Sequence, residues 1–181
     1  MMLFFVERFI DWDNFIYAIG EIGTYDNSLF QNNVFWETGV ISPRYLIDYV
    51  FSAIMHLNGG NWAGAALIWL YFGAIVQSLG ITNIVIRLVD KYHIFYAILL
   101  SCLFAYNDNS LGGYNIMSLG STSVGAAVAF SILSVSFLFG KRDYNLAWVF
   151  AGCSAICHIH EGIYCATVIF IFALTDFVLA K

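Results

Sequence analysis

One uncharged stretch constrains this chain more than any other feature. Trp62 to Ile86 is a run of twenty-five residues without a charged side chain. At a rise of about 1.5 Å per residue, a helix of that length crosses the roughly 30 Å hydrocarbon core of a bilayer. Only 10% of the 181 residues are charged and 61% are apolar, whereas about 25% of the residues in a soluble domain are charged. The sequence therefore predicts a polytopic α-helical membrane protein and excludes an ordinary soluble domain.

Further apolar segments predict an all-α transmembrane bundle with short interfacial or re-entrant helices. They are Ile94–Tyr106, Thr122–Gly140, Leu146–Cys157 and Ile163–Leu174. The last two are separated only by HIHEG, from His158 to Gly162, and predict a helical hairpin. Tyr45 to Leu57 has thirteen residues and includes Asp48 and His56, so it either crosses the membrane or lies flat in the outer leaflet.

Charge divides the chain into two regions. Residues 1–48 hold seven acids and two bases, and residues 49–181 hold five of each. We therefore expect an acidic N-terminal region with interfacial helices over residues 1–61, and one transmembrane unit over residues 62–181. The opening segment has charges between helically spaced aromatics, which predicts an amphipathic interfacial helix rather than a signal peptide. Without clustered Lys and Arg, nucleic acid is excluded as a partner.

The positions of the basic residues predict the orientation. Short cytoplasmic loops collect Lys and Arg. If the spans alternate from Trp62 onward, five bases fall on one side: Arg87, Lys91, Lys141, Arg142 and Lys181. This side, with the C-terminus, is expected to be cytoplasmic. The 107–121 loop and HIHEG then face outward.

The HIHEG segment carries the most distinctive polar side chains. Ionisable groups at this position in a membrane protein indicate a functional site, here one in which His158, His160 and Glu161 contact a substrate. Exposed turn residues at the headgroups are an equally good interpretation. The two histidines would point to different faces of one helix, so joint metal binding would need a non-helical turn at Gly162. No metal or haem site is predicted, and the four cysteines are interpreted as packing residues.

Two other motifs have a functional and a structural interpretation. Glu21, Asp26 and Glu37 lie in a stretch that we expect to be irregular and that also contains aromatic residues. Such a carboxylate could bind a cation or act as a general base near a sugar hydroxyl, or be a solvated loop charge beside interfacial aromatics. Gly60 and Gly64 form a G-x-x-x-G pattern, which lets membrane helices approach closely.

The order of these features resembles a known family. Four features in this order resemble the N-terminal half of bacterial polytopic proteins of the glycosyltransferase C type. They are TYDNSLF, ISPRYLIDYVFSAI, a polar loop with paired glycines, and GCSAICHIHEGIYCATVIFIFAL. The resemblance implies a lipid-linked sugar donor, a role in cell-envelope glycan assembly and a place in the bacterial inner membrane. It implies that Asp26 is the catalytic base or a metal partner. Pro43, Arg44 and Asp48 match the family's "PR…D" stretch, and His158 matches its hairpin histidine.

The chain departs from this family in two ways. No clear span precedes Asp26, and the chain has four to six apolar segments where the family has eight or more, as expected of a fragment or a truncated relative. Mechanistically, Asp26 would deprotonate an acceptor hydroxyl, while His158, His160 or Arg44 would balance the donor phosphate.

Two other classes of function fit the sequence. In a transporter or channel subunit, His158, His160 and Glu161 would line an outward vestibule. In a non-catalytic scaffold, Gly60, Gly64 and the small residues of Thr122–Gly140 would pair with a partner membrane subunit. Membrane lipid is a partner in all three classes.

Overall fold

The computed structural model describes residues 21–26, 28–29, 45–106 and 123–180, and these residues form helices and turns without a strand. A short helix over residues 21–25 comes first. The longer helices are α4 (Tyr45–Leu57), α5 (Trp62–Leu88), α6 (His93–Tyr106), α7 (Ser123–Ser136), α8 (Tyr144–Cys157) and α9 (Ile159–Leu179). The all-α prediction is confirmed. The predicted interfacial helix near the N-terminus and the 107–121 loop lie outside the described residues.

Two helices are long and apolar enough to cross a membrane. They are α5, with 27 residues, and α9, with 21 residues. Only 39% of the most apolar window of α5 and 17% of that of α9 are buried inside the chain. Large apolar side chains such as Ile75, Phe170 and Phe177 face outward, each more than half exposed. An apolar helix surface that the rest of the chain leaves uncovered is more stable in contact with lipid than in contact with water.

The described α7 is shorter than the predicted span, because its helix ends at Ser136 rather than Gly140. After Ser136 the chain forms tight turns instead of a helix. The backbone N–H groups of Phe137 and Leu138 donate to the carbonyls of the residues three positions earlier. Gly140 then reverses the chain with a φ of +62°. The apolar composition of this segment did not reveal the turn. At about 1.5 Å per residue, α7 and α8 are each roughly 21 Å long, less than a bilayer core.

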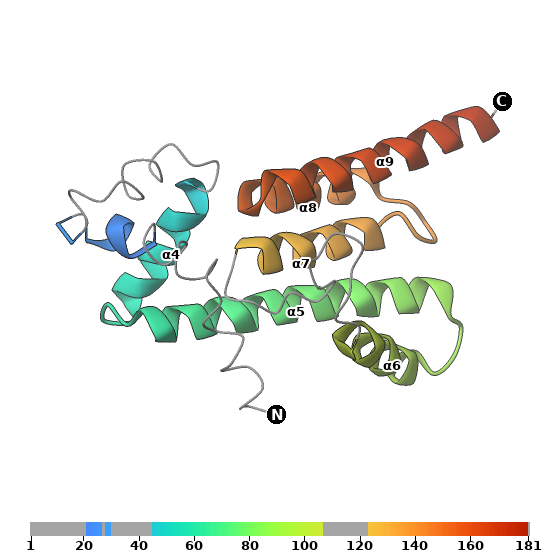
Figure 1. The fold of residues 1–181 in the computed structure, drawn as a ribbon. Coiled ribbons are helices and arrows are strands. Elements are labelled where there is room, and N and C mark those ends of the chain that lie inside the picture. The colour runs from blue at the N-terminus through green and yellow to red at the C-terminus, as the bar shows by residue number, and fades with distance from the viewer. Residues whose placement is uncertain (1–20, 27, 30–44, 107–122, 181) are drawn as a thin grey trace.

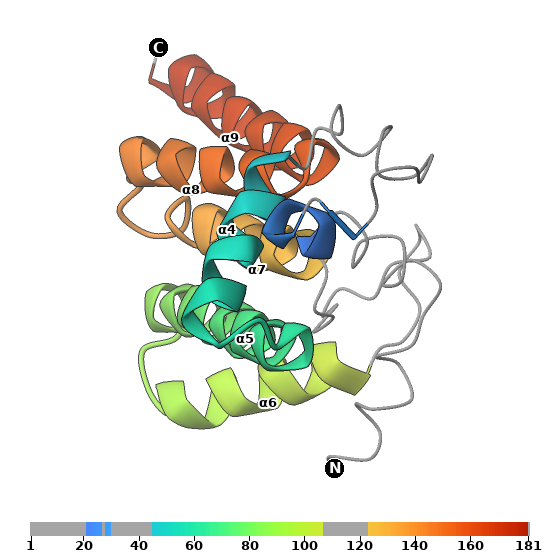
Figure 2. The same cartoon turned by 90° about the vertical axis from the view of Figure 1, so that its left-hand side faces the viewer.

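The helices form a row in the order α6, α5, α7, α8, α9 (Figure 2). α5 and α7 run in the same direction, since Ala65 and Ala66 near the start of α5 pack with Ala126 and Ala127 near the start of α7. α8 runs back along α7, and α9 returns along α8 (Figure 1). α6 lies steeply across α5 (Figures 1 and 2) rather than beside it as a further span.

Small residues let the central helices approach closely. A Cβ on Gly80 of α5 would lie 2.8 Å from the backbone nitrogen of Leu133 in α7. Serine hydroxyls join α7 to α8: Ser134 donates to the Ala147 carbonyl at 2.6 Å, and Ser154 donates to the Ala127 carbonyl at 2.9 Å. Helices in membranes commonly associate through small residues and through hydrogen bonds from hydroxyl groups.

The structure contradicts the surfaces predicted for a scaffold. Gly60 lies in the turn before α5 with a φ of +79°, so Gly60 and Gly64 do not share a helical face. The small residues Ala126, Ala127 and Ala129 of α7 are buried against other helices of this chain. They are therefore used within the chain and are not exposed for a partner.

The bundle has two chemically different ends. At one end, α4 lies across the bundle: its Ile47, Phe51 and Met55 share one buried cluster with Ala65 at the start of α5 and Cys157 at the end of α8. The opposite end carries the bases. There the Arg87 guanidinium at the end of α5 donates to the carbonyls of Phe139 and Lys141. The segment Tyr45–Leu57 thus covers an end of the bundle (Figure 1) and does not run along it as a further span.

Candidate functional site

The helix over residues 21–25 is held against the turn between α4 and α5. The indole Nε1 of Trp62 donates to the Glu21 carboxylate at 2.9 Å. The rings of Tyr25 and His56 lie with their centroids 4.5 Å apart. Gly60 leaves room for the Tyr25 hydroxyl, which would be 2.7 Å from a Cβ at that position. The predicted irregular loop is therefore wrong for residues 21–25, because these long-range contacts stabilise a helical turn.

Asp26 follows this helix and is fixed by Ser28. One carboxylate oxygen, Oδ1, accepts hydrogen bonds from the Ser28 backbone N–H at 3.0 Å and from its hydroxyl at 2.6 Å. These bonds favour the charged form and lower the pKa of Asp26 below its ordinary value of 3.8. Asp26 is thus a carboxylate at neutral pH, and it loses its charge only below the usual acidic range. A carboxylate with a lowered pKa is a poorer general base and a better partner for a cation.

Asp48 lies in the first turn of α4 and is only 8% exposed. A carboxylate in the first turn of a helix is stabilised by the helix dipole. The start of α4 lies beside the end of α8, since the two helices contact each other and the first turn of α4 is nearest the α8–α9 junction (Figures 1 and 2). Pro43 and Arg44, predicted to belong to the same site, lie outside the described residues, as does Glu37.

The histidines lie at the junction between α8 and α9. His158 has an extended backbone conformation, with φ −156° and ψ 113°. It is both the C-cap of α8 and the N-cap of α9. Its ring and that of His160 have centroids 5.4 Å apart. His160 is exposed and Glu161 is partly buried in the first turn of α9.

The predicted helical hairpin is present, but the connection between its two helices is shorter than the five residues of HIHEG, because only His158 is non-helical. α9 already begins at Ile159, and Gly162 lies within it. The glycine serves helix packing instead of a turn: a Cβ there would lie 2.3 Å from the Cβ of Ala155 in α8. The two histidines therefore do not share a helical face. No group of three or more His, Cys, Asp or Glu side chains suited to a metal ion occurs in the described part of the chain.

The structure brings three predicted segments to the same end of the bundle. The helix before Asp26 contacts the turn between α4 and α5, the start of α4 with Asp48 lies by the end of α8, and the α8–α9 junction follows directly. His56 and Trp62, which anchor the Asp26 segment, were not among the predicted site residues. The only sequence feature that could have pointed to these two residues is that they flank a turn rich in Asn and Gly.

The cysteines that the structure describes fit their predicted packing role. Cys157 and Cys165 are buried free thiols, and Cys153 is partly buried. The Cys165 thiol lies 3.9 Å from the Ser131 carbonyl, between α9 and α7.

Comparison with family models, with characterised proteins and with solved structures finds no match to this chain.

Proposed function

We propose that this chain is a polytopic membrane protein that binds a lipid-linked sugar phosphate at the bundle end covered by α4, as glycosyltransferases of the C type do. One observation carries the proposal: the segments bearing Asp26, Asp48 and His158 lie at the same end of the bundle although they are far apart in sequence. Carboxylates and imidazoles together can hold a cation, balance a phosphate and move a proton.

The side chains divide this chemistry between them. The hydrogen bonds from Ser28 keep Asp26 charged, which favours the role of cation partner over that of base. His158 and His160, when protonated, would balance the donor phosphate. Both large apolar faces, on α5 and α9, would contact the acyl chains of the bilayer that delivers the donor.

Cysteine labelling tests whether these segments share a compartment. In a variant without the native cysteines, single cysteines at Asp26 and His160 are expected to react with a membrane-impermeant maleimide from the outer side. A cysteine at Lys91 is expected to react only after the membrane is opened, because this residue follows α5 at the opposite end. Labelling of positions 26 and 160 from opposite sides would contradict a shared site. Recovery of the protein in the aqueous fraction without detergent would contradict a membrane protein.

A second experiment tests the chemistry. In proteoliposomes supplied with a radiolabelled polyprenyl-phosphate hexose and a water-soluble acceptor alcohol, Asp26→Asn is expected to reduce release of the sugar to the acceptor or to water at least tenfold, because the neutral amide can neither bind a cation strongly nor accept a proton. Asp90→Asn is the matched control, since Asp90 is an exposed acid at the opposite end. Sugar release unchanged in Asp26→Asn would remove Asp26 from the mechanism. Cation flux without any sugar requirement would favour a transporter and contradict the proposal.

A further inference from the structure

An open cavity lies at the basic end of the bundle. Its volume is about 690 Å³, and it is lined by Arg87 from α5, by the loop residues Lys141, Arg142 and Asp143, and by Tyr144 and Asn145 at the start of α8. Three bases therefore face one acid. The Asp143 carboxylate is already engaged as the N-cap of α8, where it accepts the Leu146 N–H at 3.1 Å.

Arg87 is held in place with part of its guanidinium unused. Its Nη1 donates to the carbonyls of Phe139 and Lys141, both at 2.8 Å, and its Nε donates to the Asn83 side chain at 3.0 Å. The guanidinium carbon lies 5.4 Å from the centre of the Phe137 ring. A guanidinium has five N–H donors. In the described part of the chain, the two on Nη2 make no hydrogen bond.

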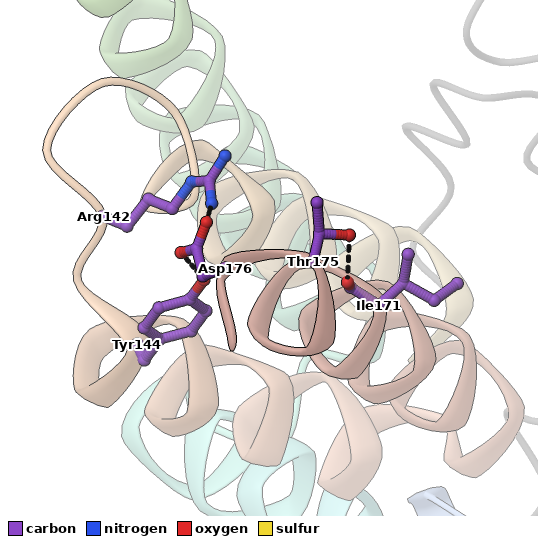
Figure 3. A network of polar contacts seen from close by, with 5 residues as sticks. All are labelled: Arg142, Tyr144, Ile171, Thr175 and Asp176. Carbon is purple, nitrogen blue, oxygen red and sulfur yellow. Dashed lines mark hydrogen bonds and ion pairs between the residues drawn. The ribbon is translucent and has the colours of Figure 1, made fainter. Parts of the chain in front are cut away.

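Arg142 is fixed in a similar way. It forms an ion pair with Asp176 of α9, and the other carboxylate oxygen of Asp176 accepts the Tyr144 hydroxyl at 2.5 Å (Figure 3). The guanidinium carbon lies 5.2 Å from the centre of the Phe172 ring. Only Nη1 is engaged by Asp176, so Arg142 still has donors to offer. Two arginines positioned before a ligand arrives reduce the entropic cost of binding it.

Lys141 is the third basic residue that lines the cavity, and its side chain is flexible. It is exposed, and its ammonium group has no ion pair or hydrogen bond among the described residues. Arginine presents a planar set of donors that matches phosphate oxygens, and lysine adds a flexible point charge.

We propose that this cavity binds a phosphate-bearing anion. Ligand sites have volumes of about 300–1,000 Å³, so a cavity of 690 Å³ has room for a phosphate together with the group that carries it. Two sources supply this chemistry: the headgroup of an anionic phospholipid, and a soluble phosphate compound. Basic cavities between membrane helices are suited to phospholipid headgroups.

The test measures binding to the full chain in neutral detergent. The probes are short-chain phosphatidylglycerol, short-chain phosphatidylcholine and inorganic phosphate. Phosphatidylglycerol is expected to bind at least tenfold more tightly than phosphatidylcholine. Lys141→Glu is expected to weaken this binding at least fivefold. The matched control is Lys91→Glu, which makes the same charge change at the same bundle end but outside the cavity, and it is expected to stay within twofold.

A second variant protects the test against misfolding. Asn145→Asp places a negative charge in the cavity but in the first turn of α8, where an acid favours the helix. It is expected to melt no lower than the native chain and still bind phosphatidylglycerol at least fivefold more weakly.

The outcomes separate the two sources. Competition by millimolar inorganic phosphate indicates a soluble phosphate ligand, and binding of phosphatidylglycerol without such competition indicates the lipid headgroup. The proposal is overturned if phosphatidylglycerol and phosphatidylcholine bind alike and phosphate does not bind. It is also overturned if Lys91→Glu weakens binding as much as Lys141→Glu.

Discussion

Replacing Gly162 with alanine is expected to lower the free energy of unfolding of the bundle by about 3 kcal/mol, at the upper end of the usual cost of overpacking. The added Cβ would lie 2.3 Å from the Ala155 Cβ and 2.4 Å from the Ala155 Cα. Backbone atoms cannot rotate away as a flexible side chain can. α8 and α9 would therefore have to move apart along their contact. Unfolding in mixed detergent micelles, with increasing dodecyl sulfate, measures the loss.

The control for this variant lies in the same hairpin. A Cβ on Gly152 of α8 would meet nothing within 4 Å. Gly152→Ala is expected to leave stability unchanged or to raise it by up to about 1 kcal/mol, through the better helix propensity of alanine. If both variants lose stability equally, the close approach of the two helices is not the reason that glycine occupies position 162.

The Gly162 variant also bears on the candidate site. The close contact between Ala155 and Gly162 sets the angle of the α8–α9 junction, and His158 lies within that junction. Widening the contact should therefore move the two imidazoles relative to α4. Gly162→Ala is therefore expected to reduce the sugar release proposed for this site as well as the stability of the bundle.

Some helix ends could be predicted, because hydrophobicity changes sharply there. Tyr45–Leu57 has the same bounds in the sequence analysis and in the structure, and the end of Ile94–Tyr106 also agrees. The end of α7 could not be predicted, because Phe137 and Leu138 are as apolar as the helix before them although they form turns. Composition reports which residues avoid water and does not report where a backbone turns.

The candidate site could be predicted as a set of residue types but not as an arrangement. The sequence singled out Asp26, Asp48 and His158, and the structure places their segments at one end of the bundle. The helical turn before Asp26 depends on Glu21 and Trp62, which are 41 positions apart. The lowered pKa of Asp26 depends on hydrogen bonds from both the hydroxyl and the backbone N–H of Ser28. Neither contact has a periodic signal in the sequence.

The basic end shows a similar limit. The charge pattern predicted that Arg87, Lys141 and Arg142 lie on one side. It did not predict that they line one cavity. That outcome depends on the early end of α7, which returns the chain at Gly140 and brings Lys141 next to Arg87.

Replacing Arg87 with methionine is expected to lower the free energy of unfolding by about 3 kcal/mol, since hydrogen bonds from a charged group contribute roughly 1.5–3 kcal/mol each and part of this is lost to solvent screening. Arg87 joins the end of α5 to the turn after α7 through the carbonyls of Phe139 and Lys141. It also orients Asn83, whose amide donates to the Ser136 hydroxyl at 2.7 Å. Methionine keeps the stem of the side chain and removes all of these bonds. The dodecyl sulfate titration measures the effect.

Two further variants decide whether geometry or charge is responsible. Arg87→Lys keeps the charge but cannot reach two carbonyls and an amide at once, so it is expected to recover less than half of the lost stability. Lys91→Met removes an exposed base three residues beyond α5 and is expected to change stability by less than about 0.5 kcal/mol, as surface substitutions usually do. If Arg87→Lys were as stable as the native chain, the positive charge alone would join the two helix ends, and the arginine would not be a preformed part of the cavity.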